Sequence, residues 1–166
     1  MSSATPIVLV HGLPGSSLVW YELAALLAAE RRVLVPERAA RGADPVEAIL
    51  AAAERERAVP FVLAGHSEGG LVALRVALER PNAVRALVLA APPDVGDLRL
   101  ELDRISCPAL VLCGARDRTA PVDGAFELAR RLRAPVRTIA AAGHLLVSER
   151  AAACAAILVR FLDGIG

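Results

Sequence analysis

The hexapeptide Gly-His-Ser-Glu-Gly-Gly at residues 65–70 is the stretch that most restricts how this chain can fold. Residues 60–64 before it form a short apolar, strand-like run, and residues 71–80 after it continue in a helical pattern without a breaker. Ser67 is therefore expected on a sharp turn, with a glycine two residues away on each side, where a side chain would collide with the opposite limb. Such a turn exposes the serine hydroxyl beside the backbone N–H groups of a helix N-terminus.

Short apolar runs alternate with helical patterns along the whole chain. The expected strands cover residues 6–10, 33–35, 61–64, 86–90, 109–113 and 136–140, and the expected helices cover residues 18–29, 45–57, 71–80, 97–104, 121–133 and 148–162. Strands that are apolar on both faces indicate a parallel sheet covered on both sides. We therefore predict an α/β fold with a doubly wound, mostly parallel six-stranded sheet and helices on both faces. Residues 1–166 contain no repeat, low-complexity tract or linker, so we assign one domain.

The charge composition argues against several classes of partner. The chain has 19 basic and 18 acidic side chains, so we expect neither a nucleic acid nor an anionic membrane as partner. All 19 basic residues are arginine, and the absence of lysine excludes Schiff-base and other lysine chemistry.

Cysteine usage and hydropathy suggest a compartment. An odd number of cysteines (Cys107, Cys113 and Cys154) without a repeated spacing argues against a disulfide framework. If the run between Cys107 and Cys113 is extended, those two residues lie ~20 Å apart, too far for a disulfide. No signal peptide and no apolar stretch near the ~20 residues of a membrane span is present, so we expect a cytoplasmic protein.

Polar residues suited to nucleophilic catalysis follow the ends of several expected strands. Ligands of such sheets bind beyond the carboxyl ends of the strands, where His11, Ser67, Asp94, Asp117 and His144 are expected. A serine hydroxyl becomes a good nucleophile when a base removes its proton and an acid holds that base in one tautomer. The three histidines are scattered without metal-ligand spacing, so we expect no metal site, and nothing indicates another cofactor.

Four of these segments together resemble the α/β-hydrolase family. They are His11-Gly12-Leu13-Pro14-Gly15, Gly65-His66-Ser67-Glu68-Gly69, Gly114-Ala115-Arg116-Asp117 and Gly143-His144. The resemblance implies that Ser67 is the nucleophile, His144 the general base and acid, and Asp117 the residue that orients His144. It further implies an oxyanion hole made by the backbone N–H groups of Leu13 and Glu68.

Several of these assignments have alternatives. Asp94 follows the preceding strand, and some relatives take their acid from that position, so it competes with Asp117. Asp123 is expected to interact with the N-terminal dipole of the next helix. His11 is expected to shape the oxyanion loop, and the side chain of His66 to point away from the active face.

The chain also departs from the family's usual pattern. Residues 92–106 are too few for the helical cap that many relatives carry, and residues 40–44 replace a Gly-His-Gly-type segment. We therefore expect an open site that favours accessible esters over chemistry that needs a closed, dry pocket. The expected function is that of a small carboxylesterase acting on a small-molecule ester.

Other functions use the same residues or the same fold. Thioesterases, lactonases and perhydrolases share this triad, and a ligand-binding or designed scaffold with little catalysis is an alternative of another class. Leu13, Trp20, Leu145 and Leu146 could supply apolar surface for a short acyl chain, while Trp20 and Tyr21 are expected to pack the first helix. Apolar surface left open by the missing cap would also suit a homodimer.

Overall fold

The computed structural model of the protein describes residues 4–12, 16–37 and 42–165. Its six strands form one sheet in the order β2-β1-β3-β4-β5-β6, and every neighbouring pair is parallel. The strands are β1 (Ile7–Val10), β2 (Val33–Leu34), β3 (Phe61–His66), β4 (Val84–Ala90), β5 (Ala109–Gly114) and β6 (Val136–Ile139). The predicted doubly wound parallel sheet is confirmed.

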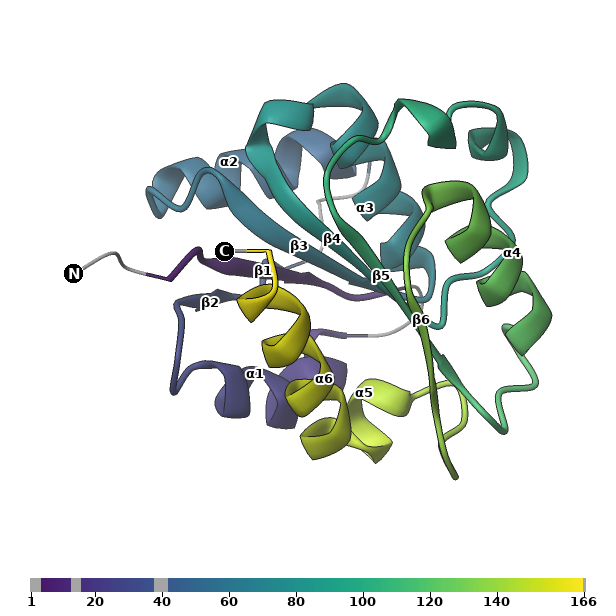
Figure 1. Cartoon of the computed structure of the whole chain (residues 1–166). Coiled ribbons are helices and arrows are strands. Elements are labelled where there is room, and N and C mark those ends of the chain that lie inside the picture. Colours follow the sequence, from purple (N-terminus) through teal and green to yellow (C-terminus); the bar gives the residue numbers. More distant parts are fainter. Residues whose placement is uncertain (1–3, 13–15, 38–41, 166) are drawn as a thin grey trace.

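Helices cover both faces of the sheet (Figure 1). One face carries α1 (Tyr21–Leu27), α5 (Leu146–Glu149) and α6 (Ala151–Asp163), and the other carries α2 (Pro45–Arg55), α3 (Glu68–Glu79) and α4 (Val122–Leu132). Four short 3-10 helices complete the described elements: η1 (Ser17–Trp20), η2 (Pro81–Ala83), η3 (Gly96–Leu100) and η4 (Leu102–Arg104). Within the described residues, no helix combines the length and the apolar character needed to cross a membrane.

The alternation of side chains along β3 explains why its sequence is apolar throughout. Phe61 and Leu63 belong to the apolar cluster beneath α2, α3 and α4, whereas Val62 and Ala64 belong to the cluster beneath α1, α5 and α6. Successive side chains of a strand point to opposite faces, so a strand between two helical layers buries both sets. Within the described residues, the two helical layers cover the faces of β3, and its carboxyl end is where a ligand could approach the strand.

Some element boundaries differ from those that the sequence predicts. The helix expected at 18–29 begins as η1, a 3-10 turn whose first residue is Ser17. The helix expected at 148–162 is two helices, because Arg150 has φ −137° and ψ 44°, outside the helical region. The helix expected at 97–104 is the pair of 3-10 turns η3 and η4. By contrast, α2 begins as expected, with an Asp44 carboxylate oxygen accepting from the Val46 N–H at 2.9 Å.

The order of the strands reverses next to β1. The chain passes from β1 outward to β2 and then returns to form β3 on the other side of β1. The carboxyl ends of β1 and β3 therefore border the crevice where open parallel sheets bind ligands. Ser67 follows β3 directly and lies at this point.

The turn at Ser67 is sharp and strained. Ser67 has φ 53° and ψ −128°, a conformation that a residue with a side chain rarely adopts. A Cβ on Gly65 would lie 2.3 Å from the carbonyl oxygen of Gly69, the opposite limb of the turn. A Cβ on Gly69 would lie 2.3 Å from the carbonyl oxygen of Val10, so a side chain at position 69 would collide with the end of β1. The strained conformation of Ser67 costs about 1–3 kcal/mol, and it persists because the packing around the turn allows no other conformation.

Two glycines of this turn provide a matched test of its packing. We expect Gly65→Ala to lower the free energy of unfolding by more than about 2 kcal/mol, because its methyl group would overlap the Gly69 backbone. Gly70→Ala should change it by less than about 1 kcal/mol, because a Cβ there meets its nearest atoms at 3.7 Å and lies within α3. Urea denaturation of both variants measures the difference, and equal losses would contradict the close approach at Gly65.

Candidate active site

Three side chains from distant parts of the sequence meet at the carboxyl edge of the sheet. Ser67 follows β3, Asp117 lies in the loop after β5, and His144 lies between β6 and α5. The Oγ atom of Ser67 is 2.9 Å from Nε2 of His144, and Nδ1 of the same ring is 2.9 Å from Oδ2 of Asp117. The structure thus brings the three residues that the sequence singles out into one continuous hydrogen-bonded line.

The carboxylate of Asp117 is buried and held by its own loop. Its side chain has no exposed surface, and its Oδ1 accepts hydrogen bonds from the backbone N–H groups of Thr119 at 2.8 Å and Ala120 at 2.9 Å. These two donors leave Oδ2 directed at His144. Because a carboxylate only accepts, Nδ1 of His144 carries the hydrogen and Nε2 is left to accept from the Ser67 hydroxyl.

The loop that carries His144 runs close against the end of β5. A Cβ on Gly114 would lie 2.2 Å from the carbonyl oxygen of Gly143, so this approach requires a glycine. The N–H of Arg116 donates to the Ala142 carbonyl at 2.8 Å, and the N–H of Gly143 donates to Oε2 of Glu149 at 2.7 Å. The loop that carries Asp117 and the loop that carries His144 are therefore joined through their backbones as well as through these two side chains.

The alternative acid, Asp94, is engaged elsewhere. Its side chain is exposed and accepts from the Gly96 N–H at 2.9 Å and from Nη2 of Arg99 at 2.7 Å. These two donors, the backbone N–H first, lower the pKa of the Asp94 carboxyl group. His144 is bound to Asp117 instead, so the geometry favours Asp117 as the partner of the histidine.

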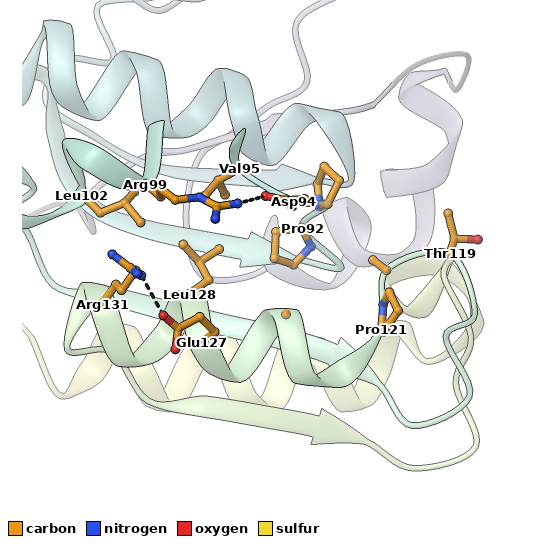
Figure 2. Close-up of a pocket in the computed structure, with 13 residues that line it drawn as sticks. Pro92, Asp94, Val95, Arg99, Leu102, Thr119, Pro121, Glu127, Leu128 and Arg131 are labelled. Carbon is orange, nitrogen blue, oxygen red and sulfur yellow. Dashed lines mark hydrogen bonds and ion pairs between the residues drawn. The ribbon is translucent and has the colours of Figure 1, made fainter. Parts of the chain in front are cut away.

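Asp94 borders a groove of about 360 Å³ between residues 92–102 and α4. Figure 2 shows Thr119 and Pro121 at the end of the groove to which the strands point. The pairs Asp94–Arg99 and Glu127–Arg131 lie along its sides. The segment between β4 and β5, too short for a cap, therefore forms one wall of a side groove.

Of the two backbone N–H groups expected to bind an oxyanion, the structure describes one, that of Glu68. Leu13 lies outside the described residues. Glu68 is the first residue of α3, at the positive end of that helix. Gly12 is close to it, since a Cβ on Gly12 would lie 3.0 Å from the backbone nitrogen of Glu68. The chain after β1 thus comes into contact with the residue that follows the serine.

His66 occupies a place that the sequence interpretation missed. We expected its side chain to point away from the active face, but it reaches the backbone of His144, with Nε2 2.8 Å from the carbonyl oxygen. The ring is buried, and this burial lowers its pKa. Strand alternation could have indicated this position, because His66 falls on the same face of β3 as Val62 and Ala64, beneath α5 and α6.

The apolar side chains expected near the nucleophile divide into two groups. Trp20 and Leu146 are fully buried in the core, so neither offers a wall to a substrate. Leu145 is 49% exposed beside His144. Tyr21, expected to pack the first helix, is 72% exposed instead. Among these described residues, Leu145 is the one that both adjoins the triad and presents apolar surface.

The three cysteines are poorly suited to act as nucleophiles. Cys107, Cys113 and Cys154 are free thiols, two of them buried. Burial raises the pKa of all three, that of Cys154 to about 11. They therefore remain protonated at neutral pH, and a protonated thiol is a poor nucleophile.

Comparison with known proteins supports the interpretation of this fold. Residues 7–106 match the model of the alpha/beta hydrolase family. The chain is 32% identical over 101 residues to the lipase LipV of Mycobacterium tuberculosis, an alignment covering 55% of this chain and 38% of that protein. It is 40% identical over 116 residues to the esterase PIR7B of Oryza sativa subsp. japonica, covering 57% of this chain and 42% of that protein.

A solved structure extends the likeness to almost the whole chain. The enol-lactonase from Burkholderia xenovorans LB400 superimposes with a TM-score of 0.87 at 18% identity, covering 98% of this chain and 92% of that one. This likeness concerns the fold. The chain spans less than half the length of the two curated relatives described above. With the family match covering more than half of its residues, the chain belongs to the alpha/beta hydrolase family.

Proposed function

We propose that the protein is a serine hydrolase that cleaves small carboxylic esters through an acyl-enzyme intermediate. The observation that carries this proposal is the continuous hydrogen bonding from Ser67 through His144 to Asp117, with 2.9 Å at each step. A hydroxyl, an imidazole and a buried carboxylate in this order are the groups that acyl transfer requires. Relatives named lipase and esterase agree with ester hydrolysis.

In the first step, Oγ of Ser67 attacks the carbonyl carbon of the ester. A carbon–oxygen bond forms, the carbonyl electron pair moves onto its oxygen, and Nε2 of His144 takes the serine proton. The imidazolium that results lies against the Asp117 carboxylate, whose remaining oxygen is held by two backbone N–H groups. The acid therefore stabilises the charge of His144 and keeps the proton on Nδ1 in the resting enzyme.

The negative oxygen of the tetrahedral intermediate needs donors that are already in place. We assign this role to the backbone N–H of Glu68, at the start of α3, and to that of Leu13 in the loop after β1. Contact between Gly12 and the backbone of Glu68 supports this assignment, because it brings the two segments to the same point. Loss of one such donor typically costs ~10²–10³ in rate.

The intermediate then collapses to the acyl-enzyme. The bond to the leaving oxygen breaks, and His144 gives its proton to the departing alcohol. A water molecule next loses a proton to His144 and attacks the acyl carbon, which gives a second tetrahedral intermediate. The bond from this carbon to Oγ of Ser67 then breaks, His144 returns its proton to Oγ, and the carboxylic acid leaves. The same base thus acts in both halves of the cycle.

The surroundings of the triad favour a small and accessible substrate. Among the described residues, the segment between β4 and β5 contains two 3-10 turns beside α4, and the His144 side chain is 22% exposed. The acyl-enzyme is therefore open to water, which favours hydrolysis. Thioesters and lactones react through the same steps, so the substrate class is best determined by a screen of acyl-chain length and leaving group.

Removal of the nucleophile is the primary test. We expect Ser67→Ala to lower kcat for a short-chain p-nitrophenyl ester by at least about 10³-fold while the protein remains folded. Ser148→Ala is the matched control, because the Ser148 hydroxyl donates to the Leu145 carbonyl outside the triad, and it should keep the full rate. A fluorophosphonate probe should label Ser67 stoichiometrically. Substantial turnover by pure Ser67→Ala would exclude the proposed mechanism, and a protein that neither reacts with the probe nor turns over esters would be a binding scaffold.

The two candidate acids can be compared directly. Asp117→Asn places an amide where the carboxylate accepts from Nδ1, so the histidine loses its orientation and its counter-charge. We expect kcat to fall by about 10³-fold or more. Asp94→Asn removes an exposed charge paired with Arg99 and should leave kcat within about twofold of the parent protein. Steady-state kinetics at one pH measure both, and a collapse in Asp94→Asn alone would reverse the assignment.

A further inference from the structure

We propose that His66 is a positioning residue for the general base, holding the backbone of His144 by donating a hydrogen bond to its carbonyl oxygen. This inference rests on the proposed function of His144. The distance from Nε2 of His66 to that oxygen is 2.8 Å, and the His66 residue is 4% exposed. A carbonyl oxygen only accepts, so Nε2 must carry the hydrogen.

The ring of His66 is packed from two sides. The ring of His144 lies at a centroid distance of 5.2 Å, tilted by 51°, and the indole of Trp20 meets it edge-on at 6.2 Å. Trp20 itself is 1% exposed, at the end of η1. The donor is therefore directed by side-chain packing as well as by its own hydrogen bond.

Because His66 directly precedes Ser67 in the sequence, its hydrogen bond to His144 links two parts of the site. His66 is the last residue of β3 and is covalently joined to Ser67. Its bond to the His144 carbonyl therefore ties the strand of the nucleophile to the backbone of the base, across 78 residues of sequence. Asp117 holds Nδ1 of the His144 ring, and Glu149 accepts from the N–H of the preceding residue, Gly143. The ring, the carbonyl and the loop of His144 therefore each have a separate partner.

A neutral His66 also suits the charge that develops beside it. His144 becomes an imidazolium during the proposed reaction, and a second positive ring next to it would oppose that step. Burial is the main cause that lowers the pKa of His66, and nearby His144 acts in the same direction, whereas Asp117 and the hydrogen bond to the carbonyl act against them. A neutral His66 with hydrogen on Nε2 donates to the His144 carbonyl and does not repel the positive charge that develops on the His144 ring.

Two substitutions separate the donor from the bulk of the ring. Gln carries an amide N–H near the position of Nε2, whereas Met fills a similar length without a donor. We expect His66→Met to lower kcat for a p-nitrophenyl ester by about 10- to 100-fold with KM within about threefold, because small displacements of a base are costly. His66→Gln should recover kcat to within about fivefold of the parent protein. Ile49→Ala serves as the control for lost stability, because it creates a cavity in the apolar cluster on the opposite face of the sheet. This variant should leave kcat unchanged.

Equal kcat values for folded His66→Met and His66→Gln would overturn the proposal, whether both match the parent protein or both are deficient. A second measurement needs no variant. Nitrogen-15 NMR of the imidazole rings in the parent protein at pH 7 should show His66 neutral with hydrogen on Nε2. A charged ring, or hydrogen on Nδ1 alone, would also overturn the proposal. Neither NMR result depends on ester turnover, so failure of this inference is distinguishable from failure of the proposed hydrolase activity.

Discussion

Close contact between backbone segments at three glycines is the constraint on which the rest of this structure depends. Gly69 packs against the end of β1, Gly65 against the opposite limb of its own turn, and Gly114 against the carbonyl of Gly143. In each case an added methyl group would lie within 2.3 Å of a backbone atom, closer than real Cβ atoms come. The ends of β1, β3 and β5 and the histidine loop can therefore meet, and Ser67 is forced into its strained conformation where they do.

The polar interactions of the site build on this packing and make His144 their centre. Its ring bridges Ser67 and Asp117, its carbonyl accepts from His66, and the N–H before it is held by Glu149. Asp117 has no exposed side-chain surface, yet each of its oxygens has a partner, so the cost of burying its charge is offset by hydrogen bonds. Preorganisation of this kind lets a site stabilise developing charge without rearranging during the reaction.

Much of this arrangement could be predicted from the sequence because it follows from local patterns. Apolar runs indicated the strands, and the carboxyl ends of parallel strands lie at one edge, so Ser67, Asp117 and His144 could be placed together. The choice between Asp94 and Asp117 could not be made that way, since both follow strands that end at this edge, and the pairing of Asp94 with Arg99 is seen only in the structure. His66 was missed because β3 runs two residues beyond its apolar stretch, so a polar residue continues its buried face. The break at Arg150 carries no glycine or proline to indicate it.

The short connection between β4 and β5 bears on how His144 is held in place. In the described part of the chain, this connection forms turns beside α4 and one wall of a side groove, instead of a domain above the histidine. A histidine loop without a large covering element has to be fixed from within the fold. The bond from His66 acts from beneath the loop, in a layer shared with Trp20, and the bond from Glu149 acts from the helix that follows. Two of the partners that orient His144, His66 and Asp117, are themselves buried, so this histidine can be held in place without a lid.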